Sequence, residues 1–295
     1  MRLPIKKAAA LLSASLALTA FLSAVGNVGP LSENKVGIRL YGGLTYLFAD
    51  EFNRGFQGQL DMWRYAAAVE GSSGETGFAG AHWGFDAGAD LLLPLSPRAT
   101  LQVGAAAVTA SALSQADFGP QDVVPSGHEV KITPRALSIQ ASLCYLVPVS
   151  SRLGIRIQAG AAYFLARPEA EYRREWSDYW ELDRYSLKSK GFGYQGGIGL
   201  ELRLNRWAAI FLEGLGRYAR IPNFSGSLET TSSEEGQILR EGDLYFYDYK
   251  LAEGAVFPFI DVLEQEPSGP AFSEVGKAVV DFSGFSLNLG LILKF

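Results

Sequence analysis

The sequence predicts an all-β fold: an eight-stranded antiparallel up-and-down transmembrane β-barrel with short turns at one end and four long loops at the other. Three observations predict it. Eight stretches alternate apolar and polar side chains with a period of two, as a strand with one apolar face does. Short and long connections alternate strictly between these stretches. The last stretch, 285–295, alternates almost without a break up to Phe295.

A closed barrel accounts for all three observations, because each of its strands has one face in lipid and one face toward the lumen. The alternative is a soluble β-sandwich, whose last strand could alternate in the same way. A sandwich gives no reason, however, for the loops to be sorted by length onto opposite ends.

The eight predicted strands are 36–48, 77–93, 100–111, 131–147, 153–165, 191–204, 207–221 and 279–295. For all but the seventh, the apolar face is marked in chain order by Leu40 and Leu44, Trp83 and Phe85, Leu101 and Val103, Leu137 and Ile139, Ile155 and Ile157, Leu200 and Leu202, and Leu287 and Leu289. The fourth strand starts out of phase near Pro134, where we expect a bulge. The seventh is ambiguous, because Phe211 and Leu215 share a face with Glu213.

The connections predict the orientation. The three short ones are 94–98, 148–152 and 205–206, and the four long ones are 49–76, 112–130, 166–190 and 222–277. Short periplasmic turns and long extracellular loops are typical of bacterial barrels. The same order predicts an even number of strands, with both ends of the barrel on the periplasmic side.

The N-terminal segment predicts export. Three cations, Arg2, Lys6 and Lys7, precede the apolar run 8–25, and a small-residue cleavage site follows at 24–26. We therefore expect a signal peptide at 1–26 and a mature barrel at 27–295. The alternative is an uncleaved anchor. A lipid-anchored protein is disfavoured, because no cysteine follows the apolar run.

Composition agrees with a barrel and excludes several classes of function. The mean hydropathy is close to zero, as expected when a lipid face is averaged with a polar lumen. The single cysteine, Cys144, cannot form an intramolecular disulfide. No metal-ligand spacing, phosphate-binding loop or dinucleotide fingerprint is present, so we expect no cofactor. The acidic balance argues against nucleic acid as a partner.

The C-terminal strand resembles the assembly signal of bacterial outer-membrane proteins, in which a polar residue, a glycine, a hydrophobic residue and a final aromatic recur at fixed spacing. Asn288, Gly290, Leu293 and Phe295 occupy these positions, and Leu293 departs from the pattern because an aromatic is commoner there. The resemblance implies recognition by the barrel assembly machinery.

Across 27–295, the alternation, the loop order and the terminal aromatic resemble the small eight-stranded barrels of the OmpA membrane-domain, OmpX and OmpW types. That resemblance implies a monomer in the cell outer membrane of a Gram-negative bacterium, in contact with outer-membrane lipid and lipopolysaccharide. Members of such a fold family differ in function, so the resemblance leaves the role open.

The predicted lumen face carries balanced charges. Arg39, Arg156, Arg203 and Arg217 oppose Asp86, Asp90, Glu201 and Glu213. An eight-stranded barrel is only wide enough to be filled by its own side chains, and buried charges are tolerated when they are paired and hydrogen-bonded. We expect a polar plug that holds the barrel rigid. The alternative is a selectivity filter or a gate.

We expect no catalysis. His82 lies on the inward face of the second predicted strand, where a hydrogen-bonded lumen residue is the simpler interpretation. Ser126, His128 and Glu129 could in principle supply a nucleophile and a base, but neighbouring loop residues seldom adopt that geometry. The predicted role is therefore structural or surface-exposed and non-enzymatic.

The loops suggest two alternative functions. In the first loop, Phe56, Leu60, Trp63 and Ala67 recur at helical spacing, which indicates a short amphipathic lid. Such a lid, with the other loop aromatics, would suit a narrow conduit for small apolar solutes. The simpler interpretation is that these aromatics form the interfacial girdle and pack the loops.

The second alternative is surface binding through the long loops, as in an adhesin. The chain has 31 acidic and 26 basic residues; without the three cations of the signal, 31 minus 23 leaves −8. Segment 222–277 holds eleven acidic and three basic residues, again −8. We expect this loop to form a partly ordered cap that attracts divalent cations or a basic partner.

Overall fold

The computed structural model describes residues 35–71, 75–118, 126–234 and 236–295. The predicted signal peptide at 1–26 and the start of the mature chain at 27 lie outside the described residues. No helix among the described residues is both long and apolar enough to cross a membrane.

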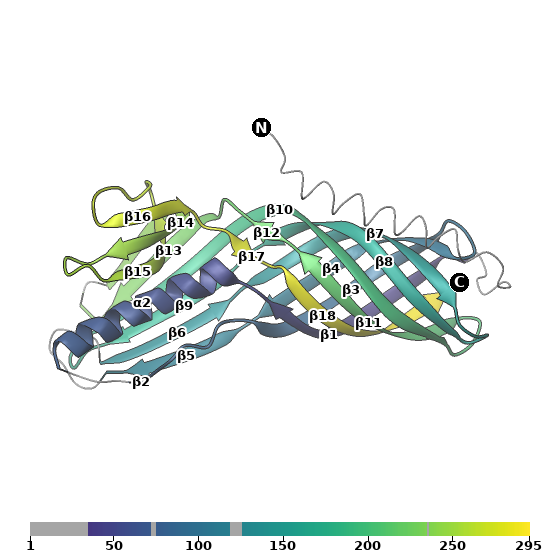
Figure 1. The fold of residues 1–295 in the computed structure, drawn as a ribbon, viewed down its shortest axis with the longest axis horizontal. Helices are drawn as coiled ribbons and strands as arrows, with labels where there is room; N and C mark the ends of the chain where they lie inside the picture. The colour runs from purple at the N-terminus through teal and green to yellow at the C-terminus, as the bar shows by residue number, and fades with distance from the viewer. Residues whose placement is uncertain (1–34, 72–74, 119–125, 235) are drawn as a thin grey trace.

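Eight antiparallel strands close into a barrel (Figure 1). They are β1 (Gly37–Leu47), β3 (Trp83–Pro94), β4 (Ala99–Ala110), β7 (Arg135–Pro148), β8 (Leu153–Ala166), β10 (Trp180–Arg203), β11 (Ala208–Tyr218) and β18 (Gly284–Lys294). Each strand pairs with the next in this order, and β18 pairs with β1. Closure satisfies the hydrogen bonds of every barrel edge. The predicted fold class is confirmed.

Alternation along the strands separates an apolar exterior from a polar interior. On β18, Phe285, Leu287 and Leu289 are 56–64% exposed, whereas Ser286 and Asn288 are buried. The partner strands keep the same phase, since β18 and β1 are in register from Gly37 opposite Lys294 to Leu47 opposite Gly284. The predicted division into two faces therefore holds where the barrel closes.

Where the structure describes them, the four long connections are largely regular in secondary structure. Their strands extend the barrel wall as a second sheet with strand order β2-β5-β6-β9-β10-β13-β14-β15. These strands are β2 (Glu75–Gly77), β5 (Ala112–Asp117), β6 (Gly127–Thr133), β9 (Glu169–Glu175), β13 (Ser225–Ser232), β14 (Gly236–Lys250) and β15 (Val256–Leu263), with β16 (Phe272–Lys277) paired to β14. The pair β12 (Arg220–Ile221) and β17 (Val280–Asp281) joins barrel and sheet. We call the second sheet, β16 and helix α2 the loop module.

Helix α2 (Asp50–Val69) lies along the loop module, at the end of the molecule opposite the C-terminus (Figure 1). It packs mainly on β15, and also on β17 and β6. Phe52, Phe56 and Leu60 are at most 1% exposed and belong to a continuous apolar core. The helical spacing in the first loop is therefore confirmed, and its apolar face packs the loop module.

Several predicted strands differ from the structure at their upper ends, and the fourth and sixth show why. Pro134, where we expected a bulge, instead separates β6 from β7, because proline cannot donate a ladder hydrogen bond; its carbonyl still accepts from Ala110 at 3.0 Å. The sixth strand begins at Trp180 instead of 191. Its first half pairs with β9 and β13 of the loop module.

The contact of α2 with β15 gives a test of the loop module. Gly58 faces β15, and a Cβ there would overlap the backbone carbonyl of Pro258. Gly58→Ala raises helix propensity by up to about 1 kcal/mol, but overpacking against backbone costs about 1–3 kcal/mol. We expect faster tryptic cleavage of α2 at Arg54 and a lower urea midpoint.

Gln57→Ala is the matched control, because Gln57 is exposed on the same helix and gains the propensity without a clash. Equal proteolysis of the two variants would show that α2 is not seated against β15.

Candidate functional site

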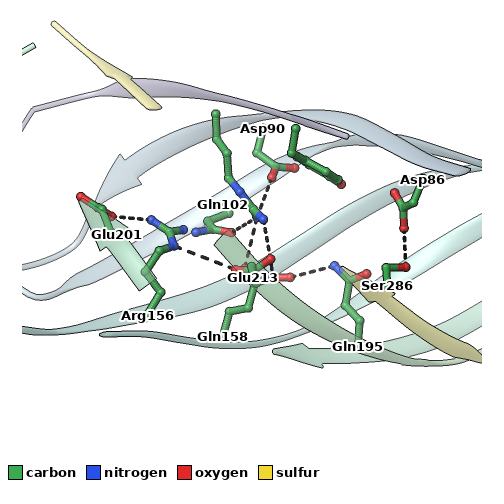
Figure 2. Close-up of polar contacts among 12 residues, drawn as sticks. Asp86, Asp90, Gln102, Arg156, Gln158, Gln195, Glu201, Glu213 and Ser286 are labelled. Carbon is green, nitrogen blue, oxygen red and sulfur yellow. Dashed lines mark hydrogen bonds and ion pairs between the residues drawn. The ribbon is translucent and has the colours of Figure 1, made fainter. Parts of the chain in front are cut away.

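The barrel lumen is organised around one buried guanidinium. Arg39 on β1 is 2% exposed, and its Nη1 donates to Asp90 at 3.2 Å, Gln102 at 3.1 Å and Gln158 at 3.3 Å. Its Nη2 donates to Glu213 at 2.5 Å. These four partners come from β3, β4, β8 and β11 (Figure 2). One side chain of β1 thus ties together four other strands across the interior.

A second guanidinium extends the contacts toward the turn end of the barrel. Arg156 on β8 donates to Glu201 at 2.8 Å and lies 4.0 Å from Glu213 (Figure 2). Glu201 also accepts from Lys294 at 3.2 Å. Arg156, Glu213 and Arg39 therefore form a continuous chain of alternating charge.

An aromatic ring supports both guanidinium groups. The Phe211 ring lies 4.4 Å from the Arg39 guanidinium carbon and 5.5 Å from that of Arg156. Cation–π contacts of this kind strengthen when the site is desolvated. Phe211 is therefore inward, which resolves the ambiguity of the seventh predicted strand. Gly290 makes room for it, because a Cβ there would lie 2.5 Å from two ring carbons of Phe211.

A third set of contacts lies toward the loop module. Arg217 donates to Asp86 at 3.1 Å and to Thr45 at 3.2 Å, and its Nε donates to the Phe282 carbonyl at 3.0 Å. Ser286 also donates to Asp86, at 3.0 Å. All three nitrogens of the Arg217 guanidinium therefore donate, and Asp86 Oδ2 accepts two hydrogen bonds, whereas Asp86 Oδ1 is buried without a partner among the described residues.

Neutral side chains link these sets. Gln140 donates to Tyr41 and to Asp90, each at 2.8 Å, and Gln195 donates to Gln140 at 3.0 Å. Sequence reasoning missed these glutamines and Tyr41 as members of the site. The signal was present, since each has the inward parity of its strand. We call the buried charged residues the lumen network; they are Arg39, Asp86, Asp90, Arg156, Glu201, Glu213 and Arg217.

The structure places the remaining predicted residues as follows. Arg203, the last residue of β10, is only half-buried and lies at the turn end. Asn288 is fully buried in the lumen, and within the described residues neither of its amide atoms has a protein partner. Leu293 is half-buried, and Phe295 is 63% exposed. The Phe295 N–H donates to the Val36 carbonyl at 2.9 Å.

His82 is hydrogen-bonded as expected, but its predicted position on the inward face of a strand is wrong. The strand begins at Trp83, so His82 lies at the rim before β3 instead of on its inward face. Its Nδ1 is 2.8 Å from the Leu47 carbonyl, and its ring stacks on Tyr46 at 5.2 Å. The backbone leaves the ladder there, so strand parity no longer applies.

Ser126, His128 and Glu129 do not converge. His128 is 3% exposed, with Nδ1 2.9 Å from the Tyr172 hydroxyl. Glu129, the next residue on β6, is on the exposed face. Ser126 donates to the Glu175 carbonyl at 3.1 Å.

The interior of the loop module holds its own polar cluster. Arg174 pairs with Asp183 and, at 2.8 Å, with Glu181, and Thr230 donates to Asp183 at 2.6 Å. Asp261 on β15 lies nearby, and burial raises its pKa to about 6. Within the described residues, no group of three or more His, Cys, Asp or Glu side chains is placed to hold a metal ion.

Among known proteins, the comparisons found similarity only to solved structures. No family model and no curated protein matches the chain. Three solved bacterial outer-membrane β-barrels resemble it. The outer membrane protease OmpT from Escherichia coli has 9% identity and a TM-score of 0.33, covering 92% of this chain and 100% of that one. The translocator domain of the autotransporter NalP from Neisseria meningitidis has 10% identity and a TM-score of 0.24, covering 98% of both.

The third is the toluene transporter TbuX of Ralstonia pickettii, with 8% identity and a TM-score of 0.17, covering 90% of this chain and 91% of that one. Likenesses this weak carry no function over to this chain. The barrel assignment rests on the observed strand pairing.

The expectation that the protein is not an enzyme is corrected by these comparisons. One of the similar structures is an outer membrane protease, so the fold class is compatible with enzymes. The absence of a recognisable catalytic cluster in the sequence was not sufficient ground for excluding catalysis.

The contacts of Glu213 give a quantitative test of the lumen network. Glu213→Leu leaves Arg39 and Arg156 without a shared carboxylate in the lumen, and breaking a buried pair costs about 3–5 kcal/mol. We expect a loss of that size in the free energy of unfolding, measured by urea titration of the protein folded in lipid.

Glu175→Leu is the control, because Glu175 is half-exposed and pairs with Arg173 on the surface, where a pair contributes about 0–1 kcal/mol. Similar losses in both variants would show that the lumen contacts do not hold the barrel together.

Proposed function

We propose that the protein lies in the cell outer membrane of a Gram-negative bacterium, with its lumen closed by the lumen network and its loop module at the cell surface. Its role is structural or surface-exposed. Its kinship with the OmpA, OmpX and OmpW types, its monomeric state and its recognition by the barrel assembly machinery remain predictions from the sequence.

The membrane placement is supported by the barrel exterior. Large apolar side chains that are 39–66% exposed occur on all eight barrel strands and include Leu44, Phe85, Val103, Leu137, Ile139, Leu143, Leu165, Ile198, Leu200, Leu212, Leu287 and Leu289. Contiguous apolar surface of this extent is rare on soluble monomers and marks contact with lipid or with another protein. A ring around a closed barrel fits lipid.

The position of Arg39 is the observation that supports a closed lumen. Its guanidinium contacts side chains on both sides of the interior at once, from Asp90 on β3 to Glu213 on β11. An eight-stranded barrel has room for little beyond its own side chains. An ion entering this space would have to separate pairs that are at most 3.2 Å apart.

The conduit for apolar solutes receives no specific support. Of the aromatics that suggested it in the first loop, Phe56 is buried in the core of the loop module, and Trp63 is partly buried against that core. In the third loop, the rings of Trp176 and Tyr179 contact each other, with their centroids 5.1 Å apart. These rings pack the module, as in the simpler interpretation.

Surface binding is the role that the loop module supports. A sheet with its own apolar core gives a rigid surface, and the acidic segment 222–277 contributes four strands to it. A partner with positive charge would complement this segment. The divalent-cation alternative lacks a site of three or more ligands among the described residues.

A closed lumen predicts that the wild-type protein is electrically silent in planar bilayers. It also predicts that Cys144, which is 3% exposed and faces the lumen, resists a charged thiol reagent while the barrel is folded. Boiling in detergent is the positive control, since unfolding exposes the thiol. Step conductance, or rapid labelling of Cys144 in the folded barrel, would overturn the proposal.

A further inference from the structure

Three cations stand side by side on the outer face of the barrel wall. Arg135, Arg167 and Lys188 follow one another across β7, the end of β8 and β10. The Arg167 N–H donates to the Arg135 carbonyl at 2.9 Å, and the pairing of Ser189 with Ala166 sets Lys188 opposite Arg167. All three side chains are exposed. We call them the basic row.

The positive charges of the basic row are only partly neutralised by neighbouring carboxylates. Arg135 pairs with Glu169, but among the described residues neither Arg167 nor Lys188 forms an ion pair. Glu241 lines the same groove but forms no ion pair with either cation among the described residues. Like charges directly opposite on neighbouring strands destabilise a sheet. An anion bound between Arg167 and Lys188 would relieve this repulsion.

A row of charges higher on the same face shows the contrast. There Lys131, Glu171, Arg184 and Glu229 alternate in sign across β6, β9, β10 and β13. Glu171 lies 4.0 Å from Lys131 and 3.7 Å from Arg184, and Glu229 lies 3.7 Å from Arg184. This upper row neutralises itself, whereas the basic row does not.

The basic row marks the upper limit of the apolar band. On β8, every outward residue from Leu153 to Leu165 is apolar, alanine or tyrosine, and Arg167 is the next outward residue. Twelve steps of about 3.3 Å, in a strand tilted by about 40°, rise about 30 Å. This height matches the hydrocarbon core of a bilayer. The three cations therefore lie at headgroup level.

Cations at this level occupy one side of the barrel. On other strands the upper outward positions hold aromatics instead, namely Tyr46, Trp83, Tyr218 and Phe285. Directly below the basic row, Lys190 is a further exposed cation opposite Leu165, and beneath it Tyr163 packs against Phe192 with ring centroids 4.9 Å apart. A charged upper end and an apolar lower end therefore adjoin on the same three strands.

A groove of about 540 Å³ opens on the basic row. Ser186, Ser225 and Ser227 line it together with the cations. Hydroxyl donors beside guanidinium and ammonium groups are suited to phosphate oxygens. The volume is in the range of sites that hold a small polar group such as a sugar phosphate.

We propose that the basic row and its groove bind a phosphate group of a phosphorylated glycolipid in the outer leaflet, the chemistry presented by lipopolysaccharide. Arg167 and Lys188 contact the phosphate directly, Arg135 contributes from its pair with Glu169, and the acyl chains lie along Leu165 and Phe192. This site rests on the outer-membrane placement proposed above. It needs no bridging cation, unlike attraction through the acidic loop.

The test uses the full barrel, refolded in detergent free of lipopolysaccharide and titrated with micelles containing lipid A. Arg167→Gln combined with Lys188→Gln removes the two cations of the basic row that form no ion pair. Each basic residue near an anionic lipid surface contributes about 1 kcal/mol, so we expect binding about thirty-fold weaker. Dephosphorylated lipid A should bind both proteins equally weakly.

The matched control is Lys131→Gln combined with Arg184→Gln, which removes two equally exposed cations from the self-neutralised row and should change binding less than three-fold. Equal weakening by both double variants would overturn the proposal, as would tight binding of inorganic phosphate without lipid. All variants must show the folded band on unboiled gels. Fractionation of cells tests the membrane placement separately, so the two failures are distinguishable.

Discussion

The structure depends on keeping charge buried inside a barrel that has no space to spare. Eight strands enclose an interior that side chains alone can fill, and Arg39 puts a permanent positive charge at its centre. Such a charge is stable only when carboxylates and amides surround it. Asp90, Gln102, Gln158 and Glu213 meet that need from four different strands. The position of each of these strands is therefore coupled to a single side chain.

The same constraint explains the apolar residues that interrupt the polar face. Phe211 and Ile292 are inward and at most 1% exposed, in a small cluster with Tyr41 and Leu92. The Phe211 ring lies against Arg39 and fills the space that Gly290 leaves. Toward the loop module the interior changes from polar to apolar along one strand: on β8, Gln158 gives way to Phe164 and Ala166. The lumen network and the core of the loop module are thus adjacent parts of one continuous interior.

The sequence was sufficient to predict the barrel, because the alternation of apolar and polar side chains is a local pattern. Along each strand, every second side chain faces lipid and the others face the lumen, and we call this alternation strand parity. Parity also placed Arg39, Asp90 and Glu213 inward, although it could not show which side chains meet across the lumen. It failed where the ladder ends, as at His82. The sheet of the loop module was not predicted, because its strands continue the barrel wall beyond the 9–11 residues that a strand needs to cross a membrane. Pairings such as β14 with β15 and β16 depend on long-range contacts that no short pattern records.

The most direct test of the central claim is a double-mutant cycle between Arg39 and Glu213. Arg39→Met and Glu213→Leu are made singly and together, and the free energy of unfolding is measured by urea titration in lipid. If the two charges stabilise the barrel through each other, the double variant should be more stable than the sum of the single losses predicts, by at least about 2 kcal/mol. Losses that add to within about 0.5 kcal/mol would contradict a barrel held together through this pair.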